Sequence, residues 1–98
     1  MDIIVEDHSI EHLENLFSAS FVLEHPLFSV VAKNTEIKWL VIVPKQSMGN
    51  DNLEYAGNVY AEIHHIANFL KKNGVEGHTN IAKIGNKHPN YHIHLVFR

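Results

Sequence analysis

The sequence predicts an α+β fold, in which an antiparallel β-sheet carries one long helix and a short N-terminal helix. Two short β-branched runs, at residues 28–32 and 38–43, flank a polar turn and are typical of a hairpin. A helical apolar pattern occupies residues 53–73, and two more strand patterns follow it at 80–84 and 91–97. Strands grouped around one long helix indicate an antiparallel sheet with the helix on one face.

The first predicted element is a short helix over residues 9–18. Leu13 and Phe17 lie one helical turn apart, and Ser9 stands at the N-cap position. The hairpin follows, and Pro44 ends its second strand because proline has no backbone N–H for the ladder. No linker or repeat divides the 98 residues, so we expect one domain over residues 1–98.

The long helix of residues 53–73 is predicted from its ends as well as from its apolar stripe. Asp51 and Glu54 have the spacing of a capping box, and Lys71 and Lys72 suit the C-terminal end of the helix dipole. The stripe consists of Ala56, Val59, Ile63, Ile66, Ala67 and Leu70. We expect this stripe to pack on the sheet.

The composition excludes several classes of function. The chain has no cysteine, which excludes disulfides, thiolate metal sites and a cysteine nucleophile. Its formal net charge of −3 does not favour a nucleic-acid partner. No apolar run approaches the roughly 20 residues that span a bilayer, and the first residues carry acidic side chains where a secretory signal has basic ones. We expect a cytoplasmic protein with no cofactor and no membrane partner, and its small size favours a homodimer.

The last predicted strand contains His92 and His94, two positions apart. Because side chains alternate along a strand, these histidines share one face with Asn90 and Val96. The other face is expected to be buried and consists of Tyr91, Ile93, Leu95 and Phe97. The histidine face is either an ordinary solvent-facing surface or a site for an anion or a metal ion, since imidazole and amide groups bind both.

A metal site is one interpretation of this pair. Two imidazoles on one strand can bind a single ion, with His88, His64 or His65 as a third ligand. No carboxylate or cysteine completes a familiar metal-binding spacing, so no metal ligand is assigned. His64 and His65 point about 100° apart on the long helix and are interpreted as exposed residues. Trp39 is interpreted as a core or dimer-interface residue.

Motifs beyond the pair resemble the histidine-triad (HIT) superfamily. The chain has the strand end Val43-Pro44-Lys45, the segment Asn80-Ile81-Ala82-Lys83-Ile84-Gly85-Asn86 and the ending Asn90-Tyr91-His92-Ile93-His94-Leu95-Val96-Phe97-Arg98. The resemblance covers residues 22–98 and is to small bacterial HIT-like proteins in which an amide residue replaces the first histidine of the triad. The family pattern is His-φ-His-φ-His-φ-φ, where φ is apolar.

The resemblance implies a role for each member of the triad. With the register set by Arg98, Asn90 takes the first position, His92 the central one and His94 the third. His92 would then attack the α-phosphate of a nucleotide and form a covalent nucleotidyl-histidine, while His94 would hydrogen-bond the phosphate oxygens or the leaving group. In the alternative register, His92 comes first, His94 is central and Val96 is third.

The resemblance also implies substrate-binding residues. Asn80 would lie near the phosphate or ribose, and Arg98 completes the terminal motif. The acidic residue that holds the ribose in the family falls in the turn after residue 32, where this chain offers Asn34 or Thr35. This chain also lacks the supporting histidine that many active members have near Ser47.

The predicted function is therefore that of a HIT-like nucleotide-binding protein. It would hydrolyse or transfer a nucleoside phosphate through His92, as a phosphoramidase or a dinucleoside polyphosphate hydrolase does. Asn90 cannot exchange a proton as histidine can, so the first alternative is a nucleotide- or phosphate-binding module with impaired catalysis. A histidine metal-binding protein is the second alternative.

Overall fold

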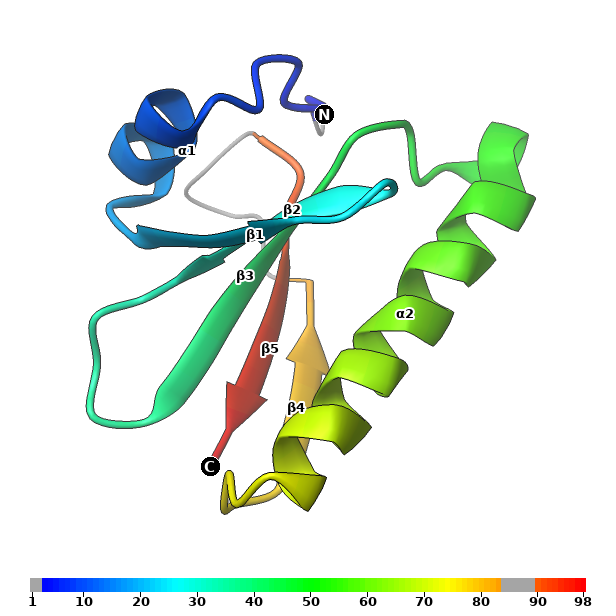
Figure 1. The fold of residues 1–98 in the computed structure, drawn as a ribbon. Helices are drawn as coiled ribbons and strands as arrows, with labels where there is room; N and C mark the ends of the chain where they lie inside the picture. The colour runs from blue at the N-terminus through cyan, green and yellow to red at the C-terminus, as the bar shows by residue number, and fades with distance from the viewer. Residues whose placement is uncertain (1–2, 84–89) are drawn as a thin grey trace.

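The structure is a computed structural model that describes residues 3–83 and 90–98. Its elements in chain order are α1 (Ile10–Phe17), β1 (Ser20–Glu24), β2 (Phe28–Ala32), β3 (Lys38–Pro44), a 3₁₀ turn (Asn50–Asn52), α2 (Leu53–Lys72), β4 (Thr79–Ala82) and β5 (Ile93–Phe97) (Figure 1). The predicted turn at residues 85–89 and the last residue of the predicted strand 80–84 lie outside the described residues.

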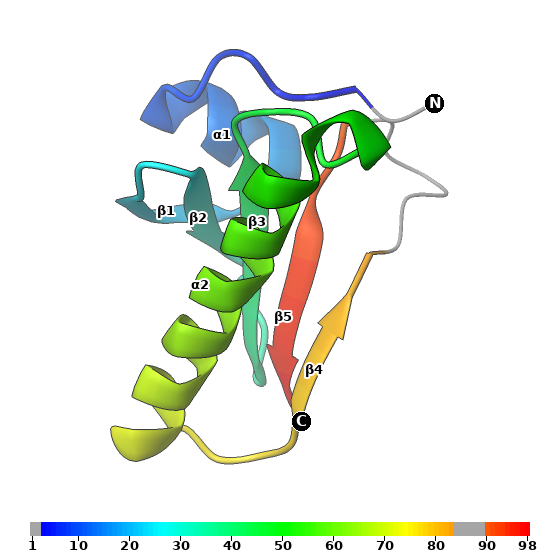
Figure 2. The same ribbon diagram turned by 90° about the vertical axis from the view of Figure 1, so that its right-hand side faces the viewer.

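The five strands form one antiparallel sheet in the order β1-β2-β3-β5-β4. This confirms the predicted α+β class, with its hairpin, long helix and short N-terminal helix. The strand β5 lies between β3 and β4, so the C-terminal strand is an inner strand of the sheet (Figure 2). It is therefore fixed by hydrogen bonds on both sides, which makes it a rigid support for the side chains it carries.

The two helices pack on opposite faces of the sheet. The stripe of α2 buries Val59, Ile63 and Ala67 against one face, which presents residues of β2, β3 and β5. On the other face, Leu13 and Phe17 of α1 pack on a set consisting of Val31, Val41 and Val43. The longer helix α2 runs along its face of the sheet, and α1 lies on the face that carries His94 of β5 (Figure 1).

Strand β1 is not predicted by the sequence pattern. Its side chains are exposed except for the half-buried Phe21, and a register shift between Phe21 and Leu23 interrupts its pairing with β2. An edge strand of this kind has no alternating buried face, because only one side of it is paired and little of it is covered. The turn at Pro26 that joins it to β2 places the two strands side by side, with His25 and Phe28 exchanging backbone hydrogen bonds of 2.7 and 3.3 Å.

The long helix begins at the predicted residue, Leu53, but it is capped differently from the prediction. Its N-cap is Asn52, which makes no side-chain cap hydrogen bond, and Asp51 lies in the preceding 3₁₀ turn. Asp51 instead accepts a hydrogen bond of 3.4 Å from Ser47 Oγ. The capping-box prediction is therefore wrong, because Asp51 belongs to the 3₁₀ turn and Asn52 takes the N-cap position. None of the helices in residues 3–83 and 90–98 is long and apolar enough to cross a membrane.

Candidate functional site

The predicted alternation of β5 is confirmed by burial. Ile93, Leu95 and Phe97 are buried in the core under α2, whereas His94 and Val96 are half-buried on the opposite face. The register of the sheet places His94 opposite Val41 of β3 and opposite Ala82 of β4. Since directly paired residues share a face, His94 lies on the face of the sheet that also carries Val41, which packs against α1.

His92 is more buried than a solvent-facing strand residue would be. It precedes β5, is 6% exposed, and its ring lies 5.2 Å from that of Phe17 on α1. The ring of His94 is 4.9 Å away and nearly perpendicular, at 84°. The interpretation of the pair as ordinary solvent-facing residues is therefore wrong for His92, because α1 covers it.

The hydrogen bond to Asn90 fixes the tautomer of His92. Its Nδ1 lies 2.7 Å from the backbone carbonyl oxygen of Asn90, which can only accept, so Nδ1 carries the proton. In the neutral ring the lone pair is then on Nε2. Asn90 is itself held by a bridge to Ile3, whose carbonyl accepts a 2.7 Å hydrogen bond from the backbone N–H of Tyr91. The N-terminal segment thus helps to position the acceptor for His92.

The side chain of Trp39 contacts His94. The indole N–H of Trp39 on β3 donates a 2.9 Å hydrogen bond to His94 Nδ1, and the two rings meet edge to face. Burial, followed by the nearby His92 and Lys33, lowers the pKa of His94 below its usual value. His94 is therefore neutral near pH 7, with its proton on Nε2.

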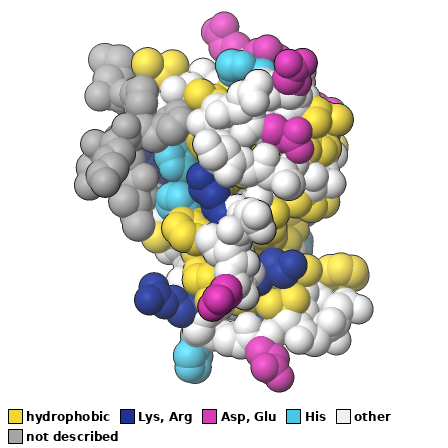
Figure 3. Space-filling model, turned by 90° about the vertical axis from the view of Figure 1, so that its left-hand side faces the viewer, with side chains coloured by type: hydrophobic (Ala, Val, Ile, Leu, Met, Phe, Trp, Pro, Cys, Tyr) yellow, Lys and Arg dark blue, Asp and Glu magenta, His cyan; other side chains and the backbone are white. Residues whose placement is uncertain are grey.

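Two cavities of about 240 Å³ each meet at His94. The Phe17 cavity is lined by Leu16, Phe17, Ser18, Lys33, Val41, His92 and His94. The Asn80 cavity is lined by Ile37, Trp39, Asn80, Ala82, His94, Val96 and Arg98. On the face that Figure 3 shows, histidine side chains lie beside a basic side chain, and the acidic side chains lie toward the ends of the molecule. An anionic ligand would meet little negative charge there.

The predicted site residues divide between the two cavities. His92 and His94 line the Phe17 cavity, whereas Asn80 and Arg98 line the Asn80 cavity with His94. Asn80 donates a 3.0 Å hydrogen bond from its amide to the carbonyl of His78. Asn90 acts here through its backbone carbonyl. Asn34 is exposed in the turn after β2 and lines neither cavity, so a ribose contact by it stays a prediction.

Sequence reasoning missed two residues of the site, Trp39 and Lys33. Trp39 was expected in the core or at an interface, but its N–H contacts His94. Lys33 lines the Phe17 cavity, where its ammonium donates a hydrogen bond to the carbonyl of Phe17. The available signal was alternation, which puts Trp39 and Val41 on one face of β3. Only the pairing of β3 with β5 shows that this is also the face of His94.

The other histidines that the structure describes do not form a metal site with the pair. His64 and His65 are exposed on α2, as predicted, and His65 pairs with Glu62 at 3.2 Å on that helix. Within residues 3–83 and 90–98, no group of three or more His, Asp or Glu side chains is arranged to hold a metal ion. His88 lies outside these residues.

Comparisons with known proteins add one clear likeness. No protein-family model matches the sequence, and no curated protein matches it significantly. Among solved structures, a histidine triad protein from Bradyrhizobium japonicum superposes with a TM-score of 0.71 and 25% sequence identity, covering 89% of this chain and 67% of that one. The sheet, the two helices and this likeness together show that the chain is a member of the HIT-like superfamily.

Proposed function

We propose that the chain is a nucleotidyl hydrolase or transferase in which His92 forms a covalent bond to the α-phosphate of a nucleotide. The observation that carries this proposal is the 2.7 Å hydrogen bond between His92 Nδ1 and the Asn90 carbonyl. A neutral imidazole whose Nδ1 is held as a donor presents its lone pair at Nε2, which is the form required of a nucleophile. The Phe17 cavity beside it, of about 240 Å³, could receive the phosphate end of the nucleotide.

The neighbouring side chains fit the charge that such a reaction develops. His94 would donate its Nε2–H to the phosphate oxygens, and Lys33 would supply positive charge at the same cavity. We assign Asn80 and Arg98 to the part of the substrate that enters the Asn80 cavity, and Asn34 to the ribose. The roles of His94, Asn80 and Asn34 are those that the family resemblance implies, and Asn90 accepts the hydrogen bond of His92 through its backbone carbonyl.

The test uses adenosine and guanosine 5′-monophosphate esters of 4-nitrophenol, whose release of nitrophenolate is followed by absorbance. The protein should give turnover, and an alkaline denaturing quench should trap one nucleotidyl group on His92, seen by mass spectrometry. His92→Ala should abolish both signals. The matched control is His64→Ala, an exposed histidine on α2, which should leave both unchanged. Turnover that persists in His92→Ala would contradict the assignment of the nucleophile.

The alternative function, a binding module without catalysis, is favoured by one residue. Asn90 replaces the first triad histidine, and an amide cannot transfer a proton. This alternative predicts that nucleoside monophosphates bind, as measured by calorimetry, while no ester is turned over and no adduct forms. Binding should then weaken in Lys33→Met, because that change removes positive charge from the Phe17 cavity.

We also propose that the protein is a cytoplasmic homodimer. Support for a second copy comes from exposed apolar side chains on neighbouring parts of β1 and α2, where Val22, Leu23 and Phe69 border one apolar groove. Light scattering at micromolar concentration tests the dimer, and Phe69→Ser should shift the equilibrium toward the monomer if this surface forms the contact.

A further inference from the structure

We propose that Trp39 is a positioning residue that holds His94 as a neutral hydrogen-bond donor, and that the site consequently acts on nucleotides whose leaving group departs as a weakly basic oxyanion. Phosphate, carboxylate and aryl oxide groups share this chemistry. The inference rests on the proposed function, since it concerns the bond that breaks when His92 attacks the α-phosphate. That step is the departure of the leaving group, which a protonated His94 would otherwise assist as a general acid.

The first step of the argument is the direction of the hydrogen bond. An indole N–H can only donate, so the 2.9 Å contact requires a lone pair on His94 Nδ1. Protonation of His94 would place a second N–H on Nδ1, facing the indole N–H, and both groups would then be donors. The protonated form loses this bond and gains a repulsive contact in a half-buried site, so Trp39 disfavours it.

The second step is the charge around His94. Among the residues that the structure describes, the titratable or charged groups that face it are His92 beside it, Lys33 at the Phe17 cavity and Arg98 at the Asn80 cavity. Among the described residues that line these cavities there is no Asp or Glu. The imidazolium form therefore gains no carboxylate partner there, and the lowered pKa of His94, caused first by burial and then by His92 and Lys33, agrees with this.

The third step is what a neutral His94 can do. Its Nε2–H can hydrogen-bond a phosphate oxygen, but a neutral imidazole is far too weak an acid to protonate a departing group. Asn90 is no acid either. When the Nε2 lone pair of His92 forms the N–P bond, the P–O bond to the leaving group must break with both electrons staying on that oxygen. A weakly basic oxygen accepts them without a proton, whereas the nitrogen of a phosphoramidate does not.

In the second half of the reaction, water hydrolyses the nucleotidyl-histidine and regenerates His92. Water attacks phosphorus, the P–N bond breaks, and its electron pair returns to Nε2 of His92 while the proton of the water passes to solvent. The products are a nucleoside monophosphate and the leaving group, and His92 regains its starting tautomer. No step requires a proton from His94, so the mechanism runs with the tautomer that Trp39 imposes.

The experiment compares three adenosine 5′-monophosphate derivatives in the intact protein: the 4-nitrophenyl ester, the phenyl ester and the phosphoramidate. We expect kcat/KM to fall in that order, by about 100-fold or more overall, because loss of general acid assistance has effects of about this size. Trp39→Phe keeps an aromatic ring but removes the donor, so His94 can be protonated and the overall ratio should shrink by about 10-fold. Equal rates on all three compounds, or a ratio unchanged in Trp39→Phe, would overturn the proposal.

A spectroscopic readout separates this inference from the proposed function. Nitrogen-15 NMR of the histidine rings should show His94 Nδ1 unprotonated at pH 7, and its pKa should rise in Trp39→Phe. His8, a half-buried histidine on the N-terminal segment, should keep its pKa in the same variant and so reports an intact fold. A protonated Nδ1 in the wild type contradicts the role of Trp39 directly. If no ester is turned over, the leaving-group inference fails together with the proposed function, and the role of Trp39 is decided by NMR alone.

Discussion

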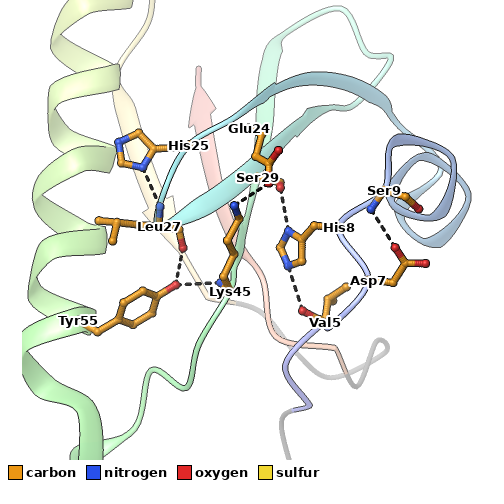
Figure 4. Close-up of polar contacts among 10 residues, drawn as sticks. All are labelled: Val5, Asp7, His8, Ser9, Glu24, His25, Leu27, Ser29, Lys45 and Tyr55. Atoms are coloured by element: carbon orange, nitrogen blue, oxygen red, sulfur yellow. Dashed lines mark hydrogen bonds and ion pairs between the residues drawn. The ribbon is translucent and has the colours of Figure 1, made fainter.

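Two half-buried histidines, His8 and His94, both have a lowered pKa, but their ring nitrogens have different hydrogen-bond partners. Burial is the largest cause that lowers the pKa of each. His8 uses both ring nitrogens within the protein: Nδ1 lies 2.7 Å from Ser29 Oγ and Nε2 2.9 Å from the carbonyl of Val5 (Figure 4). His94 uses Nδ1 for Trp39, and no residue that the structure describes makes a hydrogen bond to its Nε2.

The difference shows that a shifted pKa alone does not mark a functional histidine. His8 ties the N-terminal segment to β2, because Ser29 is fully buried and donates its hydroxyl hydrogen to His8 Nδ1. Its neutral state is a structural requirement. The neutral state of His94 leaves an N–H beside two cavities, where a ligand can accept it. The partner of Nε2 therefore distinguishes the structural histidine, His8, from the candidate functional one, His94.

The largest expected effect comes from His94→Ala. Removal of a donor aimed at developing charge typically lowers kcat by about 100- to 1,000-fold, and we expect a loss of that size with the 4-nitrophenyl ester. The unfolding midpoint in urea should change little, because His94 is half-buried and borders cavities. Rate and stability are measured on the same preparation. If His94→Ala has a normal kcat, His94 has a structural role like that of His8 and no role in the reaction.

The reverse pattern is expected for Ser29→Ala. The change removes a buried hydroxyl and leaves His8 Nδ1 without its donor, which should lower the free energy of unfolding by about 1–3 kcal/mol. Urea denaturation monitored by Trp39 fluorescence gives this value. The rate per folded molecule should be unchanged, since Ser29 lines neither cavity. A selective loss of activity at full stability would argue against a purely structural His8.

A smaller effect, common to both histidines, is expected when pH is varied. Each folded pKa lies below the ordinary value of 6.5, so between the folded and unfolded pKa values the unfolded chain binds more protons. The contribution of the two neutral histidines to the free energy of unfolding is thus fully present above about pH 6.5. It is lost as pH falls toward the folded pKa values. Thermal melts from pH 8 to pH 5 measure it. The loss should be reduced in Trp39→Phe, whereas a melting temperature that rises on acidification would contradict the sign.

The smallest effect is expected from Glu24→Gln. Glu24 pairs with Lys45 at 2.7 Å near His8, but its carboxylate is fully exposed, so the pair is screened by solvent. The negative charge of Glu24 raises the pKa of His8, so its removal should lower that pKa slightly further while the melting temperature stays the same. Proton NMR titration of His8 checks this, with His94 as the reference that should not move.

The sequence predicted the strongly periodic parts of the fold well. The stripe of α2 and the alternation Ile93, Leu95, Phe97 each need only one buried face, so they are visible in a linear pattern. It missed β1, whose side chains are mostly exposed and whose strand conformation comes from pairing with β2. It predicted the first residue of α2 but not its cap, because a 3₁₀ turn at Asn50–Asn52 precedes the helix in place of the predicted capping box.

For the site, the sequence pattern alone places His92 and His94 on one face of a strand, and the family resemblance implies that Asn90 takes the first position of the triad. A period of two residues fixes that relation within a single strand. The burial of His92 by α1, the hydrogen bond from Trp39 to His94 and the two cavities beside His94 all depend on tertiary packing. Trp39 and His94 are 55 positions apart, and a contact over that distance depends on strand pairing, which local periodicity does not encode.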